Sequence, residues 1–165
     1  MVVAHTRSSI CSITNSSITE TLTNVEKYFS NTNNLINSPF FLPYLSGERT
    51  PHNDPYIRGS FHSMKTTTSS TNLQYAVIEG VSFGILDGVN SILKVNKNFE
   101  KIFMVGGGSK SKFWIELIAS LLNRNLSVCN QSEFGAALGV ARLAMHVDKN
   151  INSDVSIIKE IKISE

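Results

Sequence analysis

The sequence predicts an α/β fold, because strand-like and helix-like segments alternate along its second half. A buried strand pattern over residues 101–105 leads into three glycines and then into a helical pattern over residues 111–123. A second short strand over residues 126–129 and a last helix over residues 134–146 follow in the same order. Alternation of this kind is typical of α/β domains. With 165 residues, of which 41% are hydrophobic, the chain is long enough for one domain with a buried core.

The first 37 residues are poorly defined by their sequence. Ser, Thr and Asn dominate residues 5 to 38, and periodic apolar positions are few. The only element expected there is a short helix around Val25 to Phe29.

A proline-rich segment comes next. All four prolines of the chain fall in residues 39 to 59, whose sequence is PFFLPYLSGERTPHNDPYIRG. Prolines and Asn-Asp-Pro impose extended and turn conformations. Because the segment also carries aromatic and aliphatic residues, we expect an anchored loop, which the adjacent Glu48 and Arg49 help to order.

A long helix is expected from Thr71 onward. Thr71 and Gln74 match a capping box, in which the two side chains satisfy free backbone amides. Apolar residues then recur at helical spacing over about five to six turns: Leu73, Val77, Val81, Ile85, Val89 and Ile92. A second stripe consists of small residues at intervals of four: Ala76, Gly80, Gly84 and Gly88. Since each interior glycine costs about 1 kcal/mol relative to alanine, we expect another backbone to approach this stripe closely or, alternatively, a ligand to contact it.

The segments of the second half are justified by their own patterns. Residues 101–105 are mostly apolar, as in a buried strand, and the following helix is expected to turn five apolar residues inward: Trp114, Leu117, Ile118, Leu121 and Leu122. Ser132 can cap the last helix, with Glu133 favourably placed at the positive end of the helix dipole. Gly135 and Gly139 in that helix are interpreted as close-packing positions.

The glycine-rich turn Gly106-Gly107-Gly108-Ser109 connects a strand to a helix. A dinucleotide-binding fingerprint needs a third glycine where Ser111 stands, and no alignment of GGGSKSK gives a P-loop. What remains is backbone without side chains, against which a flat or charged ligand could lie, with helix amides just beyond. From the residues alone, nucleotide binding and a purely structural tight turn both stay open.

Composition excludes several function classes. The 15 basic and 13 acidic residues are scattered, so the net charge of +2 favours neither nucleic acid nor an anionic membrane as partner. No apolar segment approaches the roughly 20 residues needed to span a bilayer. Cys11 and Cys129 lie far apart without metal-ligand spacing, which favours a reduced cytoplasmic location.

Four segments together resemble the C-terminal domain of the FGGY family of carbohydrate kinases. They read, in order, FFLPYLSGERTPHNDPYIRGSF, NLQYAVIEGVSFGILDG, IFMVGGGSKSKFWIELIASLLN and EFGAALGVARLA. The pattern GSFHSM, seven residues and NLQYAVIE is similar to the second family signature, with Ser63 in place of the usual glycine. The resemblance covers about residues 38 to 146, with residues 147–165 as a C-terminal tail.

This resemblance implies an incomplete ribonuclease H-like or actin-like ATPase domain, the C-terminal domain of a two-domain sugar kinase. It implies ATP, with Mg²⁺, as the phosphoryl donor, and it places adenosine on Gly106, Gly107, Gly108 and Ser109, with Lys112 beside adenine or, alternatively, merely solvated. The loop LSGERTPH, residues 45–52, is similar to that of family members acting on D-xylulose, which implies this sugar. A homodimer is a further possibility for the full enzyme.

The resemblance also implies that essential catalytic groups lie outside this chain. The family's aspartate base and its Gly-Thr phosphate turn have no counterpart here, and Asp54 and Asp87 lie where the family does not place its base. We therefore expect no catalytic residue in this chain, sugar binding only together with an N-terminal domain, and no activity of the chain alone. The alternatives are a non-catalytic module that retains the fold and a kinase of another sugar or polyol.

Overall fold

The computed structural model describes residues 17–30, 38–95 and 101–128, together with residues 137, 139–141 and 143–144. The elements are, in order, α2 (Ile18–Phe29), β1 (Phe40–Leu42), β2 (Ser60–His62), α3 (Ser70–Val95), β3 (Ile102–Met104), the 3₁₀ helix η2 (Gly107–Lys110), α4 (Lys112–Leu122) and β4 (Leu126–Val128). The described residues beyond β4 are helical. They fall within the helix predicted over residues 134–146, whose cap Ser132 and Gly135 lie outside the described residues.

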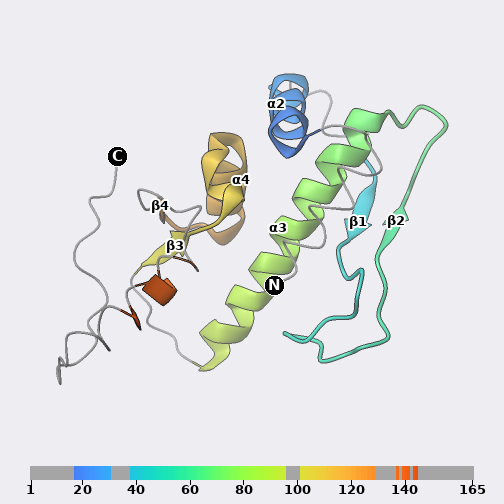
Figure 1. The fold of residues 1–165 in the computed structure, drawn as a ribbon. Helices are drawn as coiled ribbons and strands as arrows, with labels where there is room; N and C mark the ends of the chain where they lie inside the picture. The colour runs from blue at the N-terminus through green and yellow to red at the C-terminus, as the bar shows by residue number, and fades with distance from the viewer. Residues whose placement is uncertain are drawn as a thin grey trace.

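The long helix α3 is the centre of the fold (Figure 1). The antiparallel hairpin β1–β2 lies on one side of it, and α4 with the parallel pair β3–β4 lies on the other. Ile102 is in register with Leu126 and Met104 with Val128, so β3, α4 and β4 form one β-α-β unit. The α/β order predicted from the sequence is therefore confirmed in this half of the chain.

The N-terminal helix α2 is longer than the sequence predicted. Ser17 caps it by accepting a hydrogen bond from the Glu20 amide at 3.2 Å, and the helix runs to Phe29. Its buried face, made by Leu22, Val25 and Phe29, joins the core of α3 and α4, and Phe29 stacks on Tyr75 with ring centroids 4.1 Å apart. Tertiary packing stabilises this helix, so the weak apolar periodicity of residues 18–24 did not reveal its full length.

The helix α3 begins at Ser70, and its capping differs from the prediction. Ser69 and Asn72 form the reciprocal pair: the Asn72 amide donates to Ser69 Oγ at 3.2 Å, and the Ser69 amide donates to Asn72 Oδ1 at 3.0 Å. The predicted pair, Thr71 and Gln74, is displaced by two residues, because the chain offers several Ser and Thr residues in succession. The helix has 26 residues, about seven turns instead of five to six.

The glycine stripe of α3 has a different role at each position. A Cβ on Gly80 would collide with the carbonyl oxygen of Phe41, so β1 approaches this turn of the helix closely. At Gly84 the neighbour is Pro43 Cγ, at 3.4 Å, and at Gly88 no described residue would lie within 4 Å of a Cβ. Close packing is therefore confirmed at Gly80, and the described part of the chain gives Gly88 no packing partner. No described residue would lie within 4 Å of a Cβ on Gly139 either, but most residues around Gly139 are outside the described ranges.

The expectation that no apolar segment is long enough to span a bilayer is wrong for α3. By length and composition, α3 could cross a membrane, since an 18-residue window has a mean hydropathy of 1.4. Such a helix is also found in the core of folded domains, and here α3 contacts β1, α2 and α4. Among the described residues no other helix meets the same criterion.

Candidate functional site

The glycine-rich turn links β3 to α4 through η2. Gly106 has φ +92° and ψ −178°, a backbone conformation that is almost restricted to glycine. Its carbonyl oxygen accepts two hydrogen bonds from Ser109, one from the amide at 3.1 Å and one from Oγ at 2.7 Å. The turn is thus fixed by its own backbone and by the buried Ser109 side chain.

The predicted bounds of the helix over residues 111–123 are confirmed, because Ser111 and Asn123 are the two caps of α4 (Lys112–Leu122). Ser111 Oγ accepts a hydrogen bond from the Trp114 amide at 3.2 Å, as the cap of the helix. Asn123 ends the helix in the left-handed conformation, with φ 49° and ψ 46°. The helix axis and the turn that precedes it are therefore fixed by local sequence.

Trp114 explains the third glycine of the turn. A Cβ on Gly108 would lie 2.9 Å from the Trp114 ring, so the indole covers the inner side of the turn. The indole Nε1–H donates to Ser82 Oγ at 2.9 Å, which joins the turn and α4 to the middle of α3. Sequence reasoning placed Trp114 inside the core but gave no signal for its contact with Gly108, because that contact depends on the path of the turn.

Among the described residues, none would lie within 4 Å of a Cβ on Gly106, so these residues leave the outer side of the turn open. Gly108 thus serves internal packing, whereas Gly106 both permits the turn and leaves its backbone accessible. Gly107 does not have the positive φ that restricts Gly106 to glycine, since Gly106 and Gly47 are the described glycines with positive φ. An accessible, preformed backbone is suited to a flat ligand. Gly106 and Gly108 also have structural reasons to be glycine, namely the positive φ of Gly106 and the contact of Gly108 with Trp114.

Lys112 is the first residue of α4, and its ammonium lies 3.7 Å from Glu116 Oε1, one turn along the helix. The two side chains are 86% and 64% exposed. Lys112 and Glu116 therefore form a solvated surface pair, which agrees with the alternative that Lys112 is merely solvated. Among the described residues there is no group of three His, Cys, Asp or Glu side chains that could hold a metal ion, so no Mg²⁺ ligand is assigned.

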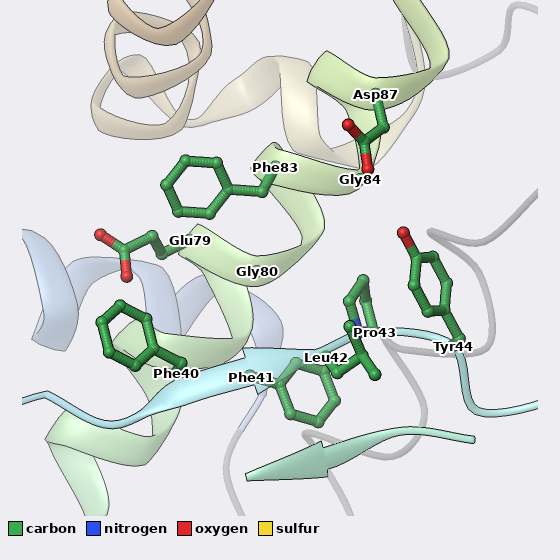
Figure 2. Close-up of a pocket in the computed structure, with 10 residues that line it drawn as sticks. All are labelled: Phe40, Phe41, Leu42, Pro43, Tyr44, Glu79, Gly80, Phe83, Gly84 and Asp87. Carbon is green, nitrogen blue, oxygen red and sulfur yellow. The ribbon is translucent and has the colours of Figure 1, made fainter. Parts of the chain in front are cut away.

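A hollow of about 210 Å³ lies between β1 and α3, away from the glycine turn (Figure 2). Its lining residues are Phe40, Phe41, Leu42, Pro43, Tyr44, Glu79, Gly80, Phe83, Gly84 and Asp87. At one end, Glu79 accepts a hydrogen bond from the Tyr75 hydroxyl at 3.0 Å. Burial raises the pKa of the Glu79 carboxyl above its ordinary value, although this hydrogen bond opposes the shift.

The other end of the hollow holds a cluster that the sequence did not predict. Tyr44 Oη lies 3.0 Å from His52 Nε2, and the same nitrogen lies 3.8 Å from Asp87 Oδ2. The proline-rich segment supplies Tyr44 and His52, while α3 supplies Asp87. Since His52 and Asp87 are 35 positions apart in the sequence, only the fold brings the two side chains together.

Comparison with known proteins identifies the family of this fold. The sequence pattern of the C-terminal domain of the FGGY family of carbohydrate kinases matches residues 2–147. The chain belongs to this family. The xylulose kinase of Escherichia coli (strain K12) is 32% identical over 126 residues, which are 76% of this chain and 26% of that protein.

Two solved structures extend the comparison. A xyloylose kinase from Brucella ovis is 32% identical with a TM-score of 0.69, over 90% of this chain and 30% of that one. A gluconate kinase from Lactobacillus acidophilus is 31% identical with a TM-score of 0.61, over 87% and 28% of the two chains. The ribonuclease H-like or actin-like ATPase fold implied by the sequence is thereby confirmed. The chain spans about a quarter of the length of the curated relatives it matches.

Proposed function

We propose that this FGGY chain is the nucleotide-side part of an ATP-dependent kinase that converts D-xylulose to D-xylulose 5-phosphate. The observation that carries the proposal is the family match over residues 2–147, together with curated relatives named xylulose kinase at 32 to 37% identity. The loop of residues 45–52 supports the same sugar. Since a gluconate kinase is almost as similar in sequence, another sugar or polyol is the alternative substrate.

Adenosine is proposed to lie on the outer side of the turn formed by Gly106, Gly107, Gly108 and Ser109. The open space beside Gly106 and the fixed path of the backbone support this placement. Lys112 is proposed to flank the adenine ring, for which its ammonium would leave Glu116. That exchange costs little, because an exposed ion pair contributes at most about 1 kcal/mol.

The remaining proposals concern the whole protein. Mg²⁺ accompanies ATP and neutralises phosphate charge during phosphoryl transfer, and the sugar binds only when an N-terminal domain closes the other side of the cleft. The aspartate base and the phosphate turn are proposed to come from outside these 165 residues. We further propose a cytoplasmic enzyme, a possible homodimer, and a division of the chain at residues 37/38 and 146/147.

A titration of the ¹⁵N-labelled chain with adenosine, ADP and inorganic pyrophosphate tests the adenosine site. We expect adenosine and ADP to shift the amides of residues 106–112 with a Kd of about 1 mM, worth about 4 kcal/mol, and pyrophosphate to leave them unchanged. Gly107→Val should abolish these shifts, because a branched side chain occupies the space of the ring. Gly88→Ala, which lies in open space on α3, is the matched control.

Two results would remove the adenosine assignment. One is a set of shifts that spares residues 106–112, and the other is a Gly107→Val variant that is folded by circular dichroism and binds ADP like the wild type. A non-catalytic module is the second candidate for the whole chain. It is tested at the DNA level, where a reading frame for an FGGY N-terminal domain, adjacent or fused, supports the kinase and its absence supports the module.

A further inference from the structure

The loop of residues 45–58, the 45–58 loop, is well ordered by its own hydrogen bonds. The backbones of Glu48 and Asp54 exchange hydrogen bonds of 2.9 and 2.8 Å, so the chain folds back on itself. The Glu48 carboxylate accepts from the Thr50 amide at 2.9 Å, and Asp54 Oδ1 accepts from the Tyr56 amide at 2.7 Å. The predicted role of Glu48 in ordering this loop is thus confirmed.

Glycines tighten the base of the 45–58 loop. Gly47 has φ +82°, and a Cβ there would lie 2.8 Å from the Pro55 carbonyl oxygen. A Cβ on Gly59 would lie 2.6 Å from Leu45 Cδ2. The loop is therefore a compact unit whose orientation depends on what connects it to the rest of the domain.

The connection to α3 runs through Tyr44, His52 and Asp87. The Tyr44 and His52 rings meet edge to face, with centroids 5.2 Å apart, and Tyr44 Oη lies 3.0 Å from His52 Nε2. The Asp87 carboxylate lies close enough to the Tyr44 hydroxyl to contribute to its raised pKa, and Figure 2 shows these two side chains at the same end of the hollow. Tyr44 is buried, while the His52 and Asp87 side chains are 42% and 49% exposed.

We propose that Tyr44, His52 and Asp87 form a latch that holds the 45–58 loop against α3. His52 and Asp87 are positioning residues in this proposal, and it does not depend on the proposed kinase function. The groups that face His52 are the Tyr44 hydroxyl and the Asp87 carboxylate from α3. The negative charge of Glu48, from within the loop, acts on Tyr44.

Tyr44 is suited to this latch because its hydroxyl stays a neutral hydrogen-bond donor. Burial, and then the negative charges of Asp87 and Glu48, raise the pKa of the Tyr44 phenol.

Trypsin cleavage after Arg49 in the full chain measures how often the loop opens. Rates are normalised to cleavage of a peptide with the sequence of residues 46–58, which gives the rate for a fully open loop. We expect His52→Ala, Asp87→Asn and Tyr44→Phe to accelerate cleavage about two- to tenfold, the range for a hydrogen bond or an exposed ion pair. The double variant of His52 and Asp87 should be no faster than the faster single variant, because both lose the same contact.

His62→Ala is the matched control, since His62 pairs with Ser60 Oγ at 2.7 Å in β2, outside the loop. The latch is refuted if the effects of the His52 and Asp87 variants multiply, or if His62→Ala accelerates cleavage equally.

Discussion

Ser82 is a buried side chain on which two elements depend. It is 1% exposed, accepts from the Trp114 indole at 2.9 Å and donates to the Ile78 carbonyl oxygen at 2.7 Å. Ser82→Ala leaves the indole N–H without its partner, which should lower the free energy of unfolding by about 1 to 3 kcal/mol. Urea denaturation followed by fluorescence of the single tryptophan measures this loss.

Ser91→Ala is the control for Ser82, because Ser91 Oγ also donates to a carbonyl oxygen four residues earlier, that of Asp87, at 3.0 Å. This control should change stability by less than about 0.5 kcal/mol. Equal losses for the two variants would mean that the Trp114 contact contributes nothing.

Glu79 gives the fold a pH dependence. Burial raises the pKa of its carboxyl in the folded state, so the folded protein binds more protons than the unfolded chain between the ordinary value of 4.5 and the raised value. Stability is therefore fully present below pH 4.5 and decreases as pH rises through the raised pKa. Glu79→Gln keeps an acceptor for the Tyr75 hydroxyl and carries no charge, so it should be more stable than the wild type at pH 7.

Denaturation by urea at pH 4.5, 5.5 and 7 measures this effect. The advantage of Glu79→Gln should grow with pH over this range. An advantage that is constant across the three values would show that the Glu79 charge is not penalised in the folded state. Glu116→Gln, at an exposed position on α4, serves as the control.

At the scale of elements, α3 contains its own comparison between a packed and an open glycine. Gly80→Ala should destabilise the fold by about 1 to 3 kcal/mol, because the added methyl group meets the Phe41 carbonyl oxygen of β1. Gly88→Ala should stabilise it by about 0.5 to 1 kcal/mol, because the space is open and alanine favours the helix. Thermal melts of the two variants measure both changes, and a shift of the same sign in both would contradict the packing of β1 on α3.

The elements that sequence could predict are those fixed by local signals. Ser111 and Asn123 mark the ends of α4 by the chemistry of caps, and this helix was predicted within one residue. The start of α3 was displaced because Ser69 and Thr71 can both act as caps, and only the structure selects Ser69. Most of α2 was missed because its stability comes from Val25 and its neighbours packing on other helices.

The site was predictable in part for the same reason. Three consecutive glycines after a strand predict a turn without side chains, and the structure has this turn beginning at Gly106. Gly108 packs against the Trp114 ring whereas Gly106 does not, and this difference depends on where the ring lies. The cluster of Tyr44, His52 and Asp87 depends on the position of α3. Contacts between residues far apart in the sequence leave no local pattern to detect.

At the scale of the whole molecule, the described elements form one core around α3. Side chains from α2, α3 and α4 are buried together, and partly buried residues of the hairpin pack against them. Large apolar side chains also remain exposed on the described surface, among them Phe40, Phe83, Val95 and Val105. Single exposed apolar side chains are common on protein surfaces.

The last prediction concerns catalysis by these 165 residues alone. Phosphoryl transfer depends on positioning both substrates and on charge stabilisation, and general-base catalysis alone contributes about 10²- to 10⁴-fold. If the base and the phosphate turn come from elsewhere, as proposed, the purified chain should release no ADP above background with D-xylulose, ATP and Mg²⁺. The xylulose kinase of Escherichia coli (strain K12), assayed in parallel, is the positive control. Turnover by this chain at about 1 to 100 per second, the ordinary range for kinases, would place a complete catalytic apparatus within it. This result would overturn the proposal that the base and the phosphate turn come from outside these 165 residues.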